Sequence, residues 1–336
     1  MKKRKPTFNP ALPFIKKDWI GNMLNLKNQY INLDGPSEKS FKELLQWQTA
    51  KNPLKALKKN QQPQVEVLLN QQYSKNSFEG FVWLGHASFL FHIGGKFCIV
   101  DPVFYGVGPL KRKTPMPCTV QTITGLDYIL LSHNHRDHAD QKSMQQLCAL
   151  NPTAIILTGL EIGNLLRAWK ITNTIIEAGW FQQYPTDAAL KITYLPAKHW
   201  NRRGLKDLNE MLWGSFMLQS EKFTVYFGAD SGMGIHFSMI ADLYPTIDLA
   251  FLGIGAYMPE WFMHPAHTSP ADALVAVEQL KAGYLIPMHH ATFDLGDEPI
   301  FYPKQEMLRL QEEQNCTSVI HAAIGKIYTW QNKSKK

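Results

Sequence analysis

The chain has 336 residues, of which 45% are hydrophobic and 12% aromatic, so it is long enough for one large domain or two ordinary ones with a buried core. Its formal net charge is +7, and seven basic residues near its two ends account for this excess: Lys2, Lys3, Arg4, Lys5, Lys333, Lys335 and Lys336. Because the body of the chain is formally neutral, a broad nucleic-acid-binding groove is not expected.

The sequence predicts neither a membrane-spanning segment nor a secretory signal. No stretch approaches the ~18 consecutive apolar residues that a spanning helix needs, and the basic N-terminus is not followed by an apolar run. The four cysteines lie far apart and form no CxxC pair, which argues against a disulfide framework and against a thiolate zinc site. We therefore expect a reduced, cytoplasmic protein.

Residues 1–75 differ from the rest of the chain because they are rich in Lys, Asn and Gln and contain few strand-like runs. Within them, residues 39–60 carry apolar side chains among many lysines, and this pattern predicts a basic amphipathic helix interrupted at Pro53. We predict that 1–75 is an N-terminal extension. Such a helix more often packs on the domain than binds a membrane surface, and both roles stay open.

Residues 76–336 are predicted to form a layered α/β domain, because strand-like runs and helical patterns follow one another along them. A hairpin is expected where Gly94-Gly95 separates two β-rich runs within 80–102. Further strands are expected at 128–132, 153–158, 192–197, 214–220, 223–229, 248–254 and 284–288, and helices near 138–150, 160–169 and 269–282. The last helix has boundary signals: Ser269 as N-cap, Pro270 in its first turn and Gly283 as its stop.

Histidines and aspartates directly follow several predicted strands. The run His-Asn-His-Arg-Asp-His at 133–138 follows one strand, and His199, Asp230 and the pair His289-His290 each follow another. Strand ends are where loops present functional side chains, and neutral imidazoles and carboxylates are ligands that zinc accepts. This set is large enough for two metal ions, which in binuclear sites lie ~3.5–4 Å apart and jointly activate water.

A single histidine at a strand end would be weak evidence, because it is more often a structural hydrogen-bonding residue. The run at 133–138 is different, since packing gives no reason to gather three imidazoles and a carboxylate in one turn. We interpret it as a metal site.

The HxHxDH spacing of this run resembles the signature of the metallo-β-lactamase superfamily. The resemblance extends in order over about residues 80–330, and it is strongest to the branch of N-acylphosphatidylethanolamine-hydrolysing phospholipases D. Its most specific segments are AYMPEWFM (256–263) and HWN (199–201) followed ten residues later by LWGSF (212–216). Other matching segments are WLGHASFLF (83–91), VDPVF (100–104), PMPCT (115–119), PAKHW (196–200) and FGADSG (227–232). The resemblance implies an αββα sandwich with a di-zinc centre between its two sheets.

The resemblance also implies which residues bind the two zinc ions. One ion would be bound by His133, His135 and His199, and the other by Asp137, His138 and His289. Asp230 would bridge the two ions. Asp137 and His267 are implied to take part in catalysis. Iron or manganese in place of zinc stays open.

Four residues near this set carry particular expectations. The branch pattern favours His289 as the ligand and His290 as the replacement of an aromatic lining residue, although two adjacent histidines leave the choice open. His267 aligns with a histidine near the reacting group, the alternative being an ordinary helix-start residue. Ala266 stands where the mammalian enzyme has a glutamine, which puts part of the substrate contact in doubt. His86 is expected to support the ligands from behind or to be structural.

The resemblance implies a binuclear zinc-dependent phosphodiesterase of the phospholipase D type, which releases N-acylethanolamine and phosphatidic acid from N-acylphosphatidylethanolamine. Aromatic residues near the expected mouth of the site would contact acyl chains, although they are equally good core residues: Trp200, Tyr257, Trp261 and Phe262. The alternative is a metal-dependent lactonase or another small-molecule hydrolase, because the fold alone does not name the substrate. The neutral body of the chain disfavours a nuclease, and the complete ligand set disfavours a non-catalytic protein.

We expect a phospholipid or another small molecule as substrate and no nucleic-acid partner, and the sequence leaves a homodimer open. Because a phospholipid lies in a bilayer, a cytoplasmic protein without a spanning segment would bind the inner membrane surface peripherally. The candidate contacts are the basic tail Lys2–Lys5 and the stretch Phe41–Lys59.

Overall fold

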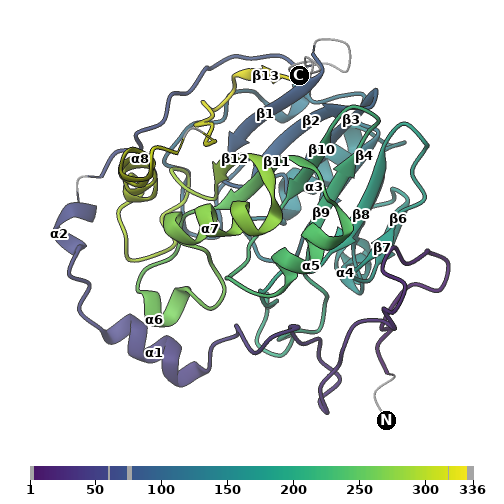
Figure 1. The fold of residues 1–336 in the computed structure, drawn as a ribbon, viewed down its shortest axis with the longest axis horizontal. Helices are drawn as coiled ribbons and strands as arrows, with labels where there is room; N and C mark the ends of the chain where they lie inside the picture. Colours follow the sequence, from purple (N-terminus) through teal and green to yellow (C-terminus); the bar gives the residue numbers. More distant parts are fainter. Residues whose placement is uncertain (1–3, 60, 74–77, 317, 331–336) are drawn as a thin grey trace.

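Two β-sheets lie face to face with helices on their outer faces (Figure 1), as the sequence predicts for an αββα sandwich. The computed structural model describes residues 4–59, 61–73, 78–316 and 318–330. Five of the basic terminal residues lie outside the described residues: Lys2, Lys3, Lys333, Lys335 and Lys336.

The first sheet has seven strands in the order β13-β1-β2-β3-β4-β5-β6, and the second has six in the order β12-β11-β10-β9-β8-β7. The first consists of β1 (Gly80–Gly85), β2 (Ser88–Ile93), β3 (Lys96–Val100), β4 (Tyr128–Leu131), β5 (Ile155–Gly159), β6 (Ile175–Ala178) and β13 (Ile327–Thr329). The second consists of β7 (Gln182–Gln183), β8 (Lys191–Leu195), β9 (Ser215–Gln219), β10 (Thr224–Phe227), β11 (Ile247–Gly253) and β12 (Ala282–Met288). Strands β3 to β6 pair in parallel, and so do β10 to β12.

The helices cover the outer faces of the sheets and the end of the molecule where the N-terminal segment runs. They are α1 (Phe41–Thr49), α2 (Lys55–Lys58), η1 (Val120–Thr122), α3 (Gln141–Leu150), α4 (Ile162–Ala168), α5 (His236–Leu243), α6 (Glu260–Met263), α7 (Pro270–Leu280) and α8 (Tyr302–Gln314).

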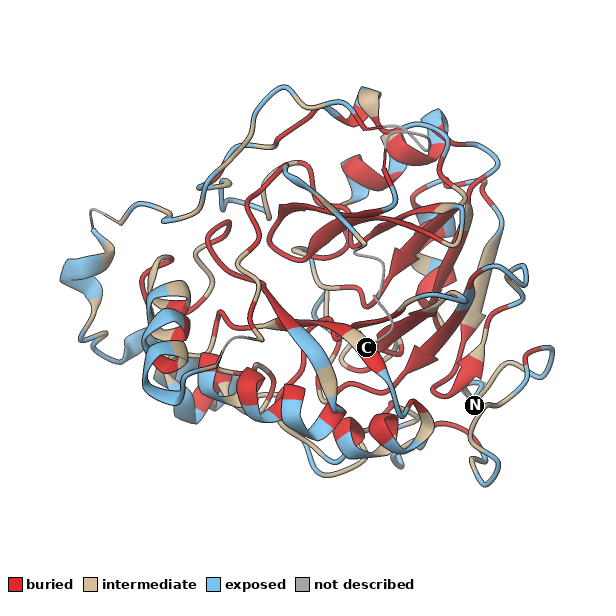
Figure 2. Cartoon of the chain, turned by 45° about the horizontal axis from the view of Figure 1, so that its top comes forward, coloured by how far each residue is buried: buried red, intermediate tan, exposed pale blue. Residues whose placement is uncertain are grey.

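Apolar residues on both faces of the strands hold the layers together. In β1, Phe81 and Trp83 belong to the larger core cluster, whereas Val82 and Leu84 belong to a second cluster with residues of α3 and α4. The Phe81 ring meets Phe251 of β11 edge-on at 5.0 Å between ring centroids. Because both faces of such strands are covered, the strands are buried almost throughout (Figure 2).

The predicted elements are largely found, with corrections at their boundaries. The hairpin at Gly94-Gly95 is confirmed as β2–β3, and a further turn at 86–87 divides the first run into β1 and β2. Helix α7 begins after the N-cap Ser269, as predicted, and the structure adds that Ser269 and Asp272 form a capping box. Its predicted stop at Gly283 is wrong, because Lys281 adopts a left-handed φ of 53° and closes the helix, so Gly283 lies within β12.

The half-buried Arg112 holds the turn between β1 and β2. Gly85 has φ +100°, and a Cβ there would lie 2.4 Å from the Arg112 guanidinium, so no larger residue fits. Burial lowers the pKa of Arg112 to about 10, which still leaves it protonated at neutral pH. Its guanidinium donates to the carbonyls of Leu84, Val103 and Thr114 at 2.8, 2.7 and 3.2 Å.

The described part of the N-terminal segment packs on the domain. Figure 1 shows it running along one edge of the molecule from the side of β7 to α1. Phe14 forms a β-bridge with Gln182, and Leu12 and Tyr30 are buried. The boundary at residue 75 stays a prediction, but residues 4–37 contribute to the core of the domain itself.

Helices α1 and α2 are separated by a turn that contains Pro53, as predicted. Neither helix has a buried residue. The Trp47 ring stacks on Phe262 of α6 at 4.8 Å, and its Nε1 donates to Asp297 Oδ1 at 3.1 Å. Helix α1 is therefore attached to the domain beside α6 through a few side chains.

Candidate metal centre

The functional side chains gather at one edge of the sandwich because the strands that precede them run in the same direction. Strands β4, β8, β10 and β12 end shortly before the run at 133–138, His199, Asp230 and His289, respectively. The turn after β1 brings His86 to the same place. The carboxyl ends of strands thus deliver residues that are distant in sequence to one point.

Three imidazoles form one group. The ring nitrogens His133 Nε2 and His135 Nδ1 are 3.1 Å apart, and His199 Nε2 is 3.0 Å from the same His135 nitrogen. Nitrogens that bind one tetrahedral zinc at ~2.0–2.1 Å are about 3.3 Å apart. The three side chains are therefore spaced as a tripod of metal ligands.

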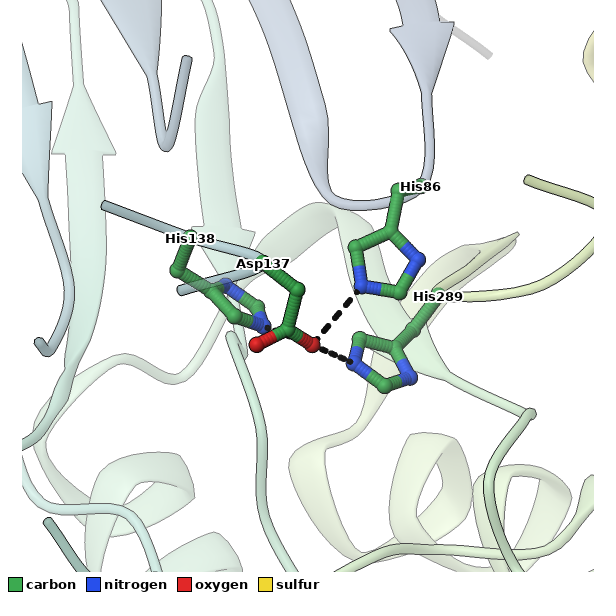
Figure 3. Close-up of side chains that lie close together, drawn as sticks. All are labelled: His86, Asp137, His138 and His289. Carbon is green, nitrogen blue, oxygen red and sulfur yellow. Dashed lines mark hydrogen bonds and ion pairs between the residues drawn. The ribbon is translucent and has the colours of Figure 1, made fainter. Parts of the chain in front are cut away.

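A second group lies beside the first and combines carboxylate and imidazole (Figure 3). It consists of His86, Asp137, His138 and His289. Asp137 Oδ2 lies 3.1 Å from His86 Nε2, 3.4 Å from His289 Nε2 and 3.6 Å from His138 Nε2. These distances allow one ion to contact several of the four residues.

Asp230 lies between the two groups. Its Oδ2 is 3.1 Å from His138 Nε2 in the second group, and 3.9 and 4.0 Å from His199 Nε2 and His133 Nε2 in the first. Its Oδ1 is 3.1 Å from His289 Nε2. One buried carboxylate thus faces both groups, which is the position expected from the sequence for a bridging ligand.

Hydrogen bonds on the far side of each ring direct the free nitrogen into the site. His138 Nδ1 lies 2.8 Å from Asp101 Oδ2, and His133 Nδ1 lies 2.9 Å from the Ser132 hydroxyl, which donates to the same carboxylate. His199 Nδ1 donates to the Ala266 carbonyl at 3.0 Å. If each Nδ1 carries the hydrogen, each Nε2 presents a lone pair toward the centre.

The ionisation of these groups follows from burial and from each other's charge. Burial alone would raise the pKa of Asp137 and of Asp230, but the neighbouring imidazoles, above all His138, hold both pKa values well below the usual range. Burial opposes protonation of His289 and His138, but the Asp230 and Asp137 charges outweigh it. They raise the pKa of His289 to about 9 and that of His138 well above its usual value. Burial holds the pKa of His133 and of His199 well below normal, so these rings are neutral.

The residues fit a bound cation. His138 Nε2, His289 Nε2 and Asp230 Oδ1 are buried and lie in charge contacts of 3.1 Å, but none of the three atoms makes a hydrogen bond of good geometry with the described residues. Buried polar atoms without hydrogen bonds are rare and costly, and a metal ion would satisfy all three. The centre is therefore suited to metal ions, and its imidazole and carboxylate donors are those of zinc and of the neighbouring transition metals.

The structure shows where the residues lie whose roles the sequence left open. His289 faces Asp230, whereas the His290 ring lies 5.0 Å from that of Trp83 and belongs to none of the metal-suited groups. His86 contacts Asp137 directly at 3.1 Å and belongs to the second group, and its supporting role stays a prediction. His267 Nδ1 lies 3.8 Å from Asp230 Oδ2 at the open side of the centre, and burial lowers the pKa of His267 to about 4.

Sequence reasoning missed Asp101 as a site residue. Its carboxylate is completely buried and accepts hydrogen bonds from the Ser132 hydroxyl and from His138. A carboxylate directly after a predicted strand could have indicated it, because Asp101 and Pro102 follow β3 at the same sheet edge as the ligands.

A groove of about 360 Å³ leads from the surface to the centre. His135, Asp137, Asp230 and His267 reach it from the centre. Its walls are apolar residues of α1, α6 and nearby loops, namely Phe41, Leu44, Trp47, Trp200, Ala256, Phe262, Met263 and Leu295. Four cationic residues also line it: Lys39, Arg136, Arg202 and Arg203. Trp200 and Phe262 thus lie at the mouth as expected, whereas Tyr257 and Trp261 are not among the lining residues.

Comparison with known sequences places the chain among related hydrolases. A family model described as "Beta-lactamase superfamily domain" matches residues 98–290, more than half of the chain. A Caenorhabditis elegans protein named N-acyl-phosphatidylethanolamine-hydrolyzing phospholipase D 1 is 29% identical over 265 residues, which cover 73% of this chain and 74% of the relative. A mitochondrial protein of Saccharomyces cerevisiae with the same enzyme name is 30% identical over 252 residues, and these cover 68% of this chain but only 51% of the relative.

Solved structures agree with the fold. A metallo hydrolase from the archaeon Ignicoccus hospitalis superimposes with a TM-score of 0.59 at 20% identity, over 75% of this chain and 98% of the other. At this identity the likeness concerns the fold and not the substrate.

Metal binding should release protons near neutral pH. His138 and His289 have raised pKa values in the metal-free protein, so both are protonated at pH 7 and must lose a proton to become ligands. We expect release of roughly two protons on zinc binding at pH 7, and an apparent affinity that rises with pH above neutrality, because both rings must be deprotonated to bind the ions. Calorimetric titration with zinc in buffers of different ionisation enthalpy measures this number.

His290→Gln is the matched control for this titration. Burial lowers the pKa of His290 to about 3, so this histidine is already neutral and its replacement should leave the proton count unchanged. A binding heat that does not depend on the buffer would contradict the assignment of protons to His138 and His289.

Proposed function

The chain belongs to the β-lactamase superfamily and is a metal-dependent hydrolase, and we propose that it cleaves a phospholipid as a phospholipase D-type phosphodiesterase with two zinc ions. The proposed substrate is N-acylphosphatidylethanolamine, with N-acylethanolamine and phosphatidic acid as products. The names of the nematode and yeast relatives support this choice of substrate.

In this proposal each group of side chains holds one ion. His133, His135 and His199 bind the first through ring nitrogens spaced about one tetrahedral edge apart. Asp137, His138 and His289 bind the second. Asp230 bridges them, which is supported by its distances of 3.1 Å to His138 and 3.9 Å to His199.

The observation that carries the choice of substrate is the composition of the groove. An apolar wall and four cations surround an entrance whose only carboxylates, among the described lining residues, are Asp137 and Asp230 at the centre. Such a groove favours a substrate that is both anionic and amphipathic. A volume of about 360 Å³ admits a phosphate and its neighbouring groups but not a whole diacyl lipid, so the acyl chains would remain partly outside.

The side chains of the groove would orient the reaction. When bound, the zinc ions would supply an activated water and would neutralise charge on the phosphate. Arg136, an exposed residue between two ligands of the HxHxDH run, would hold the phosphodiester anion at the entrance. His267 is neutral at pH 7, so it would donate a hydrogen bond to a phosphate oxygen without carrying a charge.

A lactonase is the alternative function, because a carbonyl substrate would use the same centre. A lactone is uncharged and gains nothing from Lys39, Arg136, Arg202 and Arg203 around the entrance. The cationic groove therefore favours the phosphodiester.

A side-by-side assay of a phosphodiester lipid, a lactone and an RNA oligonucleotide tests the proposed reaction. We expect the zinc-loaded protein to hydrolyse the lipid with the highest kcat/KM. Asp230→Asn should lose both metals and at least ~10²-fold in kcat, because the bridge contacts both groups. The control Asp187→Asn, an exposed residue paired with Lys96, should retain metals and activity. Preferred turnover of the lactone would overturn the proposal.

His267→Ala should separate catalysis from metal binding. We expect this variant to keep about two zinc ions per chain and to lose ~10²-fold in kcat, because one positioned donor near the transition state is missing. Metal analysis and steady-state kinetics on the same preparation measure both quantities. Loss of zinc together with activity would show instead that His267 is a ligand, and full activity would remove it from the reaction.

We also propose that α1 and α2 contact a membrane surface. None of the helices in the described part of the chain combines the length and the apolar character needed to span a bilayer. Phe41, Leu45 and Leu57 are 75%, 51% and 49% exposed, next to exposed lysines of the same segment. The basic tail contributes less than expected in its described part, because Lys5 is paired with Glu210.

Leu45→Asp tests this contact without touching the groove. The change removes half-exposed apolar surface worth ~1–1.5 kcal/mol on insertion and adds repulsion, so sedimentation with anionic vesicles should weaken about tenfold or more. Turnover of a short-chain soluble substrate should stay the same. Leu308→Asp, at a residue of α8 that is 46% exposed, is the matched control. Equal vesicle binding by the two variants would contradict the membrane contact and would mean that α1 only packs on the domain.

A further inference from the structure

The segment that precedes α1 passes against the loop that carries His199. Tyr30 is fully buried, with its backbone N–H on the Asn209 carbonyl at 3.0 Å and its hydroxyl on the Pro6 carbonyl at 2.8 Å. Two residues further on, the side chain of Asn32 is also buried and meets the backbone of His199. This segment lies outside the matched family domain of residues 98–290.

All four hydrogen-bonding positions of the Asn32 carboxamide are used. Its Nδ2 donates to the His199 carbonyl at 2.8 Å and to the Ser37 hydroxyl at 2.7 Å. Its Oδ1 accepts from the His199 backbone N–H at 3.1 Å and from Trp213 Nε1 at 3.2 Å. The Ser37 hydroxyl in turn donates to the His199 carbonyl at 2.9 Å. The backbone N–H and the carbonyl of His199 are therefore both hydrogen-bonded to the side chains of Asn32 and Ser37.

His199 needs such support because it does not lie in a regular element. Strand β8 ends at Leu195, so no sheet hydrogen bond fixes the His199 backbone. Its ring is oriented separately, through the bond from Nδ1 to the Ala266 carbonyl at 3.0 Å. A ligand on a loop stays within bonding distance of an ion only if both its backbone and its ring are fixed.

We infer that Asn32 is a positioning residue of the metal centre: its carboxamide fixes the backbone of His199 and thereby the affinity of the three-histidine group for its ion. The inference rests on the proposed role of His199 as a ligand. It means that the N-terminal segment completes the centre from outside the family domain.

Zinc affinity of Asn32→Ala, measured by competition with a chelator, tests the inference. We expect the affinity of the first site to fall 10–100-fold, as for other residues that orient a ligand. The visible absorption of the cobalt-substituted protein should change as well, because it reports the geometry around the ion. Ser37→Ala removes only one bond to His199, so this milder variant should fold and should show a smaller loss in the same direction.

Asn22→Ala is the matched control. Asn22 is equally buried in the same segment, and its Oδ1 accepts from the Trp180 backbone N–H at 3.0 Å, with no contact to a histidine of the centre. Its loss should lower the thermal stability of the metal-free protein while leaving zinc affinity and the cobalt spectrum unchanged.

The outcomes are distinguishable. Wild-type zinc affinity and an unchanged cobalt spectrum in Asn32→Ala and Ser37→Ala would overturn the positioning role, and so would an equal loss of affinity in Asn22→Ala. Failure of the wild-type protein to bind zinc would overturn the proposed function first, and the inference with it.

Discussion

The centre depends on two carboxylates, Asp137 and Asp230, that are largely shielded from water among imidazoles at the inner end of the groove. Transferring one carboxylate into a protein interior costs several kcal/mol unless an opposite charge accompanies it. In the metal-free chain His138 and His289 supply that charge by staying protonated. Bound cations would take over the same task. The cluster is therefore paired in either state, and cations and protons compete for the same nitrogens.

The rest of the structure serves to hold these groups in place. Asp101 fixes His138 directly and His133 through Ser132, and the Ala266 carbonyl fixes the His199 ring. Several residues among or beside the proposed ligands have left-handed backbones, with φ values of 54° at His86, 43° at Asp101, 53° at Ala229 and 60° at His289. Each such residue costs roughly 1–2 kcal/mol. The buried sheets on both sides, with aromatic contacts such as Phe81–Phe251, stabilise the fold enough to maintain this strain.

The sequence predicts the strands that deliver the ligands because those strands are apolar on both faces, as β4 and β10 are. It misses β6, β7 and β13. Strand β6 has four residues of which only Ala178 is buried, β7 has two residues, and the mostly exposed β13 pairs with β1, which is distant in sequence, so none of the three carries a local pattern. It also misses α5, α6 and α8. In α8 only Pro303, Met307 and Leu310 are buried, so its largely polar sequence lacks the apolar periodicity by which a helix is recognised.

The HxHxDH spacing predicts four of the ligand candidates, and strand ends together with the family resemblance predict His199, Asp230 and His289. The supporting residues Asp101 and Asn32 were not predicted. Asn32 reaches His199 across 167 positions of the chain, and an asparagine in a loop has no spacing that would reveal such a contact. For His289 and His290, which both follow β12, the resemblance favours His289 as the ligand. The contacts of the two rings show how they diverge, because His289 Nε2 lies 3.1 Å from Asp230 Oδ1, whereas the His290 ring lies 5.0 Å from that of Trp83.

The positions of the bound ions test the account most directly. Anomalous diffraction at the zinc edge, from crystals grown with zinc, should show two peaks ~3.5–4 Å apart. One should lie at bonding distance from His133, His135 and His199, the other from Asp137, His138 and His289, with an oxygen of Asp230 within reach of both. A single peak elsewhere on the chain, or no peak among these side chains, would contradict the binuclear centre on which the proposed hydrolysis depends.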